Sequence, residues 1–251
     1  MNGDISVSVI SHGQAALAAQ LLEDLRRHKP SGIEVLLTLN TQEVLPFDPA
    51  SFPFPLTTIR NPAPRGFGSN HNSAFARARG AFFCILNPDI RLTRDPFPPL
   101  VAELQDVSVG AAAPLILDPA GAVEASARPF PTLFSLARKT LGLEPRRYYE
   151  IGEKSISPDW VAGMFVMLRR EVFAAVGGFD TGYHLYYEDV DLCARLRLAG
   201  HDVRLVPTAS AVHHARRQSR AELRYALWHL RSMSRYLASD LRRRLRGAAP
   251  R

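Results

Sequence analysis

The chain has 251 residues, and 46% of them are hydrophobic, which is enough to bury the core of one large domain or two small ones and excludes a wholly disordered chain. The formal net charge is +7, but residues 216–251 hold eleven arginines against two acids, a charge of +9, which leaves −2 for residues 1–215. The basicity therefore belongs to a C-terminal segment. We expect a main domain over residues 1–215 and a basic helix and tail over residues 216–251.

The N-terminus and the cysteines restrict the class of protein further. No uncharged apolar run approaches the roughly 18 to 20 residues that cross a bilayer, so we expect no spanning helix. Residues 1–10 include Asp4 and lack a basic cluster before an apolar stretch, which is not typical of a secretory signal and favours a cytoplasmic location. Cys84 and Cys193 form no Cys-x-x-Cys spacing, so we predict buried thiols rather than a zinc site or disulfide.

The hydrophobic pattern predicts a β-α-β unit at the start of the chain, with strands at residues 5–10 and 33–39 around a helix at 14–28. Crossover rules make such strands parallel, so their carboxyl ends face one crevice where ligands bind. Further strands are predicted at residues 56–60, 81–86, 109–117, 160–168, 203–205 and 209–213, and helices at 70–79, 132–141 and 189–199. The predicted fold class is α/β, with a mostly parallel central sheet. The irregular stretch 118–159 is typical of a binding region.

Two glycines precede the helix predicted at residues 70–79, in the order Arg65, Gly66, Phe67, Gly68, Ser69 and Asn70. Glycines at such a place allow backbone N–H groups to approach an anion at the helix N-terminus. A tight turn that needs two glycines accounts for the same residues.

A carboxylate follows the strand predicted at residues 81–86, in the sequence Asn87-Pro88-Asp89. An open α/β sheet binds ligands at this edge, and a hard divalent cation there would share the oxygen ligand with the phosphates of a nucleotide. The alternative is a simple turn, because asparagine, proline and aspartate all favour turns.

Three acids begin the helix predicted at residues 189–199. Glu188, Asp189 and Asp191 complement the helix dipole there, which is a sufficient structural reason for them. The functional interpretation makes one of them a general base that deprotonates an acceptor hydroxyl. Since Asp191 can pair with Arg195 at i+4, Asp189 and Glu188 are the candidates.

His213 and His214 end the last predicted strand. Adjacent residues of a strand point to opposite faces, so one imidazole can point inward. This pair alone does not assign a metal site.

The order of these and a few other motifs is more specific than any one of them. The motifs are Val7-Ser8-Val9-Ile10-Ser11-His12, Gly66-Phe67-Gly68 with Asn70 and Asn72, Asn87-Pro88-Asp89, Trp160-Val161-Ala162-Gly163, Gly177-Gly178-Phe179-Asp180, and Tyr187-Glu188-Asp189-Val190-Asp191 with His213. Over about residues 5–215 the chain resembles the family 2 inverting glycosyltransferases, especially their rhamnosyltransferase-like branch. The resemblance implies a GT-A type, Rossmann-like sheet flanked by helices, a nucleotide-sugar donor, and Mg²⁺ or Mn²⁺ as cofactor.

The resemblance also implies roles for individual residues. Asp89 matches the last acid of the family's Asp-x-Asp metal motif, Asn87 stands where the first acid often is, and His213 is a second candidate metal ligand. Asp189 matches the catalytic base, and Glu188 is its paired acid. The implied donor-binding residues are Ser11, His12, Asn40, Arg65, Gly66, Gly68, Asn70, Asn87, Asp89, Trp160 and Gly163. Asn40 stands where many members have an aspartate that contacts the nucleobase, and its amide can bond a pyrimidine edge.

The function implied is transfer of a sugar, with inversion, to a hydroxyl of a glycan or lipid-linked acceptor in bacterial cell-surface polysaccharide synthesis. The best candidate donor is dTDP-L-rhamnose, with UDP-sugars as the alternative. A nucleotidyltransferase would use a similar sheet edge and metal but has no evident need for Asp189. A nucleic-acid-binding protein is disfavoured by the near-neutral main domain. A non-catalytic nucleotide-sugar-binding relative is disfavoured by the presence of both Asp89 and Asp189.

The C-terminal segment has the pattern of an amphipathic helix. Its leucines share one helical face, namely Leu223, Leu227, Leu230, Leu237 and Leu241. Tyr225, Trp228 and Tyr236 suit a lipid headgroup layer, and Arg242-Arg243-Arg244 would attract anionic lipid. This predicts a helix that lies on the inner leaflet as a peripheral contact. The alternative is that the leucines pack on the main domain while the arginines are solvated.

Overall fold

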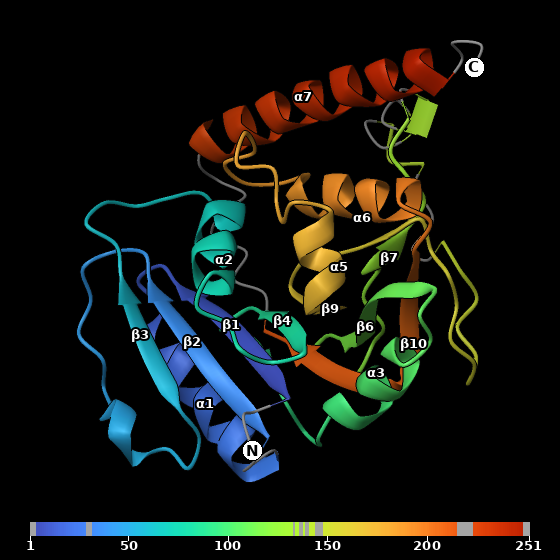
Figure 1. Ribbon diagram of the computed structural model, residues 1–251. Coiled ribbons are helices and arrows are strands. Elements are labelled where there is room, and N and C mark those ends of the chain that lie inside the picture. The colour runs from blue at the N-terminus through green and yellow to red at the C-terminus, as the bar shows by residue number, and fades with distance from the viewer. Residues whose placement is uncertain are drawn as a thin grey trace.

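The computed structural model describes residues 4–28, 32–132, 134–135, 138, 141–143, 148–214 and 223–247, with side chains of residues 225–239 in the last range. An eight-stranded sheet in the order β3-β2-β1-β4-β9-β6-β10-β5 forms its centre (Figure 1). The strands are β1 (Ile5–Ser11), β2 (Ile33–Leu39), β3 (Leu56–Arg60), β4 (Phe82–Leu86), β5 (Ile90–Arg91), β6 (Val109–Leu117), β9 (Phe165–Arg169) and β10 (Asp202–His213). A separate antiparallel pair joins β7 (Ala127–Arg128) and β8 (Trp160–Val161).

Most neighbouring strands are parallel, which confirms the predicted fold class. β3, β2, β1 and β4 run in parallel register, as do β6 and β10. β9 lies antiparallel between β4 and β6, and β5 lies antiparallel to β10. The carboxyl ends of β1, β2 and β4 therefore meet at one edge of the sheet.

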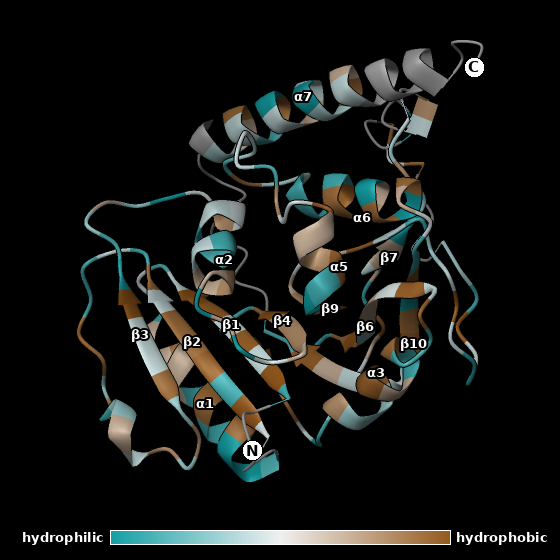
Figure 2. Cartoon of the chain, in the orientation of Figure 1, coloured by the Kyte–Doolittle hydropathy of each residue, from teal (hydrophilic) through white to brown (hydrophobic). Residues whose placement is uncertain are grey.

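Helices cover both faces of the sheet. They are α1 (Ala15–His28), α2 (Phe67–Phe75), α3 (Phe97–Leu104), α5 (Arg170–Ala175), α6 (Glu188–Leu198) and α7 (Leu223–Gly247), with a short 3-10 turn η1 (Pro49–Ser51). Side chains of β4 point alternately to the two faces of the sheet. Cys84 belongs to the hydrophobic cluster under α1 and α3. Phe83 and Ile85 belong to the cluster on the other face, under α2, α5 and α6. Hydrophobic residues recur along these central strands, whereas hydrophilic residues recur along α7 (Figure 2).

The structure differs from the predicted elements at several places. The strand expected at residues 160–168 is divided by a turn at 162–164, and the two strands expected at 203–213 form one long β10 with a register shift between Val206 and Ser210. The helix expected at residues 70–79 begins earlier, at Phe67. Helices α3 and α5 were not predicted; α3 begins with prolines, which a first helical turn accepts. The helix expected at residues 132–141 falls partly outside the described residues.

Both cysteines are buried free thiols, as predicted. None of the described helices has the length and apolar character required to span a bilayer.

The start of α2 packs directly on the segment that precedes α6. A Cβ on Gly68 would lie 2.6 Å from Phe179 Cβ, and one on Gly66 would lie 2.8 Å from the carbonyl oxygen of His184. Asn72 strengthens this contact, since its side chain accepts from the Phe179 N–H at 2.9 Å and donates to the Phe179 carbonyl at 2.8 Å. Close packing therefore accounts for both glycines and for the position of Phe179.

We predict that Gly68→Ala destabilises the fold by about 1 to 3 kcal/mol, because the added methyl group overpacks a contact with no space. Urea denaturation measures the free energy of unfolding. Gly152→Ala is the matched control, since a Cβ there meets nothing within 4 Å. Equal stability of the two variants would contradict the packing account.

Candidate active site

Polar residues follow the carboxyl ends of three parallel strands of the sheet. Ser11 ends β1, Asn40 follows β2, and Asn87 follows β4. Because these strand ends share one edge, the structure brings three of the predicted donor-binding residues to the same side of the sheet.

The Asn40 side chain has all its hydrogen-bonding positions occupied by neighbouring groups. Its nitrogen donates to the Arg65 carbonyl at 2.9 Å and contacts His12 Nδ1 at 3.1 Å. Its oxygen accepts from the Arg65 N–H at 2.8 Å and from Asn61 Nδ2 at 2.9 Å. Asn61 also donates to Asn70 Oδ1 at 2.6 Å. The network fixes the loop before α2, so a nucleobase contact by Asn40 would replace one of these bonds.

Ser11 takes part in a cap of helix α1 that involves Glu43. Ser11 Oγ donates to Glu43 Oε2 at 2.8 Å, and the same carboxylate oxygen accepts from the Ala15 N–H at 2.9 Å. An acid at this N-terminus complements the helix dipole. The start of α1 is therefore occupied by a protein carboxylate.

The turn between β8 and β9 connects the end of β4 with the start of α6. The Asn87 N–H donates to the Met164 carbonyl at 2.8 Å, and the Gly163 N–H donates to Asp189 Oδ2 at 3.0 Å. A Cβ on Gly163 would lie 3.3 Å from Asp189 Cβ and 3.6 Å from Phe67 Cε1. Three motifs that are far apart in the sequence therefore meet around Gly163.

The structure brings together Asp89 and His213, the two candidate metal ligands. Asp89 Oδ2 is 3.5 Å from His213 Nε2, and His213 Nδ1 is 3.0 Å from Glu124 Oε2. Burial alone would lower the pKa of His213, but the hydrogen bonds and charges of Asp89 and Glu124 outweigh it and raise the pKa to about 9. The imidazole is therefore protonated at neutral pH in this arrangement.

These residues fit a divalent cation that also binds a nucleotide. Asp89 Oδ1 is buried without a hydrogen-bond partner in the described structure, which leaves one carboxylate oxygen for a metal. Glu124 on Nδ1 would orient His213 Nε2 toward that metal, and binding at Nε2 requires His213 to lose its proton. The described residues contain no cluster of three or more His, Cys, Asp or Glu side chains that could hold a metal by themselves. Diphosphate oxygens would therefore complete the coordination.

Helix α6 begins after an unusual stretch of backbone. Tyr186 and Tyr187 have φ values of 70° and 66°, in the left-handed region that non-glycine residues rarely adopt. Such strain concentrates at functional sites, where surrounding contacts enforce it. Here it directly precedes Glu188 and Asp189.

Glu188 and Asp189 form a closely coupled pair of acids. Glu188 is 5% exposed, and its Oε2 has no hydrogen-bond partner in the described structure. Burial, followed by the charge of Asp189, raises the pKa of Glu188 to about 8. Burial also raises the pKa of Asp189, but backbone N–H groups of Gly163 and Val190 donate to its two oxygens at 3.0 and 2.8 Å and favour its ionised form.

The β7–β8 pair contributes Arg128, which the sequence analysis did not select. Its guanidinium lies 5.8 Å from the centre of the Trp160 ring, and its positive charge opposes part of the rise that burial causes in the pKa of Asp189. Trp160 is held by a hydrogen bond from Nε1 to the Pro129 carbonyl at 2.9 Å. The described structure assigns no carboxylate ion pair to Arg128, so its charge is available beside the pair of acids.

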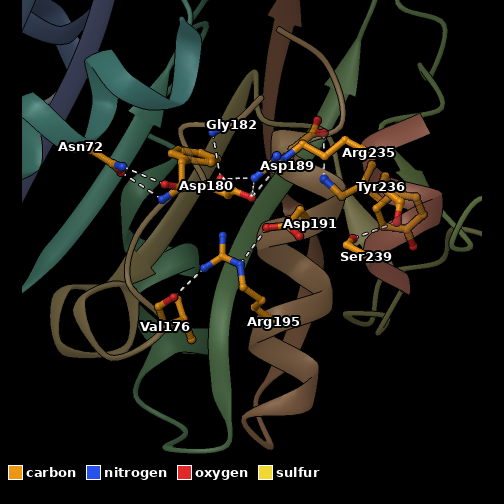
Figure 3. Close-up of polar contacts among 12 residues, drawn as sticks. Asn72, Val176, Asp180, Gly182, Asp189, Asp191, Arg195, Arg235, Tyr236 and Ser239 are labelled. Carbon is orange, nitrogen blue, oxygen red and sulfur yellow. Dashed lines mark hydrogen bonds and ion pairs between the residues drawn. The ribbon is translucent and has the colours of Figure 1, made fainter. Parts of the chain in front are cut away.

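Helix α7 packs against the strained turn and the start of α6. Ser232 Oγ donates to the Leu185 carbonyl at 2.8 Å, and the His229 ring lies 5.3 Å from the rings of both Tyr186 and Tyr187. Arg235 forms a bidentate ion pair with Asp180, and Tyr236 is 1% exposed (Figure 3). The inner face of α7 thus supports the backbone that positions the two acids.

This packing corrects part of the prediction for the C-terminal helix. Tyr236 faces the main domain rather than lipid headgroups, and Trp228 lies against His184 with ring centres 4.6 Å apart. The alternative holds for Leu237, which is partly buried against Tyr183, Tyr187 and Val190, but not for Leu227 and Leu230, which are exposed. The side chains of Leu223, Leu241 and residues 242–244 lie outside the described part of the helix.

Other predicted residues have clear structural contacts. Arg195 Nε pairs with Asp191 Oδ2 at 2.7 Å, as expected from their spacing (Figure 3). Arg65 is exposed, and its guanidinium donates to Ser73 Oγ at 2.9 Å.

Several neighbours of the site were missed because no short motif identifies them. Glu124 and Arg128 come from the irregular stretch that was expected to bind ligand, and Glu43 comes from the loop between β2 and β3. His71 follows Asn70, and its fully buried ring has Nδ1 2.8 Å from Ser8 Oγ. Burial lowers the pKa of His71 to about 3, so this imidazole is neutral and belongs to the core.

The sequence matches known proteins over most of its length. Residues 6–177 match the model of glycosyl transferase family 2, and residues 150–218 match a model described as the N-terminal domain of galactosyltransferase. The chain is 35% identical to rhamnosyltransferase WbbL of Escherichia coli over 188 residues, which are 69% of this chain and 70% of the relative. It is 36% identical over 140 residues to an N-acetylglucosaminyl-diphospho-decaprenol L-rhamnosyltransferase of Mycobacterium tuberculosis, covering 52% of this chain and 46% of that relative. The match therefore spans about half the length of the mycobacterial protein.

Solved structures share the fold at low sequence identity. Mannosyltransferase PcManGT from Pyrobaculum calidifontis, in complex with GDP-Man and Mn²⁺, has a TM-score of 0.66 at 18% identity and covers 96% of this chain and 65% of that one. GalNAc-T7 with UDP, GalNAc and Mn²⁺ has a TM-score of 0.63 at 16% identity and covers 83% of this chain and 43% of that one. The family match over residues 6–177 and the relative at 35% identity show that the chain belongs to glycosyltransferase family 2 and is a nucleotide-sugar-dependent glycosyltransferase of GT-A fold.

Proposed function

We propose that the chain transfers L-rhamnose from dTDP-L-rhamnose to a hydroxyl of a glycan or lipid-linked acceptor in the synthesis of a bacterial cell-surface polysaccharide. Two relatives named as rhamnosyltransferases support this donor, and the decaprenol in the name of one supports a lipid-linked acceptor. A UDP-sugar is the alternative donor, because the structural neighbour GalNAc-T7 was solved with UDP. The observation that carries the proposal is the pair of acids, Glu188 and Asp189, held beside Gly163 at the sheet edge.

The two acids take different parts in the proposed reaction. With its pKa raised to about 8, Glu188 keeps its proton at neutral pH. Burial raises the pKa of Asp189 too, but two backbone N–H groups and the positive charge of Arg128 favour its ionised form, so we assign the negative charge of the pair to Asp189. We assign Asp189 as the general base and Glu188 as a neutral neighbour that keeps a second negative charge out of the site.

The chemistry is a single displacement at C1 of the sugar. Asp189 accepts the proton of the acceptor hydroxyl as its oxygen forms the new bond to C1. The bond between C1 and the diphosphate oxygen breaks on the opposite face, and the diphosphate leaves with the electron pair. Attack from the face opposite the leaving group inverts the configuration at C1.

The leaving diphosphate is proposed to bind near Asp89 and His213. Asp89 and His213 would hold a divalent cation, which when bound supplies positive charge that stabilises the leaving group. Asn87 replaces one acid of the usual metal motif, so the site has fewer anionic ligands. Arg128 adds a positive charge on the side of Asp189 and Trp160.

We predict that Asp189→Asn lowers transfer by at least about two orders of magnitude while dTDP binding is retained, since the amide has nearly the same shape but cannot accept the proton. The amide nitrogen also cannot accept one of the two backbone N–H bonds, so a moderate loss of stability is expected as well. Product formation from dTDP-L-rhamnose measures transfer, and calorimetry measures binding. Asp191→Asn is the control, because it removes the ion pair with Arg195 and should affect stability rather than chemistry. An active Asp189→Asn with an inactive Glu188→Gln would exchange the two roles.

Glu188→Gln should remove a pH dependence of stability. The folded state keeps a proton on Glu188 up to about pH 8, whereas the unfolded state releases it near the ordinary value of 4.5. The wild-type free energy of unfolding therefore falls as pH rises through this window. Relative to wild type, the variant should gain stability, on the order of a few kcal/mol, between about pH 5 and about pH 9 in urea titrations. A constant difference between the two proteins across this range would contradict the raised pKa.

Asp89→Ala should abolish the increase in dTDP affinity that Mn²⁺ produces, while the melting temperature of the free protein stays close to that of wild type. The reason is that Asp89 Oδ1 has no partner to lose in the described structure, and Asp89 Oδ2 has only the 3.5 Å contact with His213 Nε2, which Glu124 also contacts. Calorimetry with dTDP, UDP and GDP, each with and without Mn²⁺, measures both the metal effect and the choice of base. If Mn²⁺ still increases the dTDP affinity of the variant, Asp89 is a turn residue and not a metal ligand. If the wild-type protein prefers GDP, the proposed donor is wrong.

A further inference from the structure

Helix α7 has a second face that the main domain does not cover. Its inner face is filled by His229, Ser232 and Tyr236, which contact the turn before α6. Leu227 and Leu230, by contrast, are 57% and 54% exposed. A helix turns about 100° per residue, so these two leucines lie together on the side away from the domain.

The exposed leucines are bordered by positive charge. Arg231 is exposed next to Leu230, and residues 216–251 carry a formal charge of +9 by sequence, whereas residues 1–215 carry −2. An apolar stripe beside arginines matches the surface of an anionic bilayer, where leucines enter the acyl boundary and guanidinium groups remain among the phosphates. Nucleic acid would use the arginines but would leave the leucines in water.

The position of α7 relates this face to the active site. In Figure 1, α7 crosses the end of the molecule where α2 and α6 lie. Its inner face contacts Tyr186 and Tyr187, which directly precede Glu188 and Asp189. A helix with its side chains is about 10 Å across, so a surface on the outer face of α7 would lie about that far from the strained turn.

We infer that the outward face of α7, defined by Leu227, Leu230 and Arg231, is a docking surface for an anionic phospholipid bilayer. Docking in this orientation brings the strained turn at Tyr186 and Tyr187 close to the headgroup layer, where a lipid-linked acceptor would present its sugar. The approach of the site to a lipid-linked acceptor rests on the proposed function, whereas the binding of α7 to lipid does not.

The test measures vesicle binding by the full chain in the absence of any sugar donor. Wild-type protein should sediment with vesicles of phosphatidylcholine mixed with phosphatidylglycerol, should bind vesicles of phosphatidylcholine alone much less, and should lose binding as salt is raised. The double variant Leu227→Ser with Leu230→Ser should reduce the partition coefficient by about tenfold or more, because two apolar side chains no longer enter the bilayer.

A matched control is the double variant Val44→Ser with Val107→Ser, since these side chains are 90% and 75% exposed and lie on other elements. It should bind vesicles as wild type does. The circular dichroism spectrum and the melting temperature should be the same for all three proteins, which would show that the leucine variant is folded.

Three results would overturn the inference. They are equal vesicle binding by the leucine variant and wild type, no binding of wild type to either vesicle, and a dimer of wild type that the leucine substitutions dissociate without any effect on vesicles. The last result would assign the stripe to self-association. Since no step of the test requires transfer, a failure of the proposed donor or acceptor would leave the vesicle result unchanged.

Discussion

The strained turn at Tyr186 and Tyr187 is the constraint on which the site depends. Two consecutive non-glycine residues in the left-handed region cost about 1 to 3 kcal/mol each, and they persist only because neighbouring elements hold them. The neighbours come from distant parts of the chain. The Phe67 N–H at the start of α2 donates to the His184 carbonyl at 2.9 Å, and Ser232 of α7 donates to the Leu185 carbonyl. The positions of Glu188 and Asp189 therefore depend on contacts between segments that are far apart in the sequence, and these contacts form only in the folded domain.

Two adjacent acids, Glu188 and Asp189, lie in a buried place directly after the strained turn. Glu188 and Asp189 begin α6, where the helix dipole favours negative charge, but burial opposes two charges so close together. The raised pKa of Glu188 resolves the conflict, because one acid stays neutral. Asp189 receives the backbone N–H bonds that Glu188 lacks at Oε2, so the charge has a defined position.

Much of the fold could be predicted from the sequence, and the motifs also selected residues that the structure brings together in the candidate site. The β-branched and apolar runs predicted the parallel strands β1 to β4, since a buried strand requires them, and the family motifs selected Asp89, Gly163 and Asp189. The antiparallel β9 could not be predicted, because strand direction depends on tertiary packing rather than on local pattern. Arg128, Glu124 and the inner face of α7 were missed for a related reason, since each acts across a long sequence separation and has no local signature.

The most direct test of the account is the stereochemistry of the product. The 251-residue chain would be incubated with dTDP-L-rhamnose, Mn²⁺ and a polyprenyl-diphosphate-linked N-acetylglucosamine, and the configuration at C1 of the transferred sugar would be determined by NMR. A single displacement with Asp189 as base predicts a rhamnoside whose configuration at C1 is opposite to that of the donor. Transfer with retention of configuration would contradict the account, since it would require a step that the arrangement of Asp189 and Glu188 does not provide.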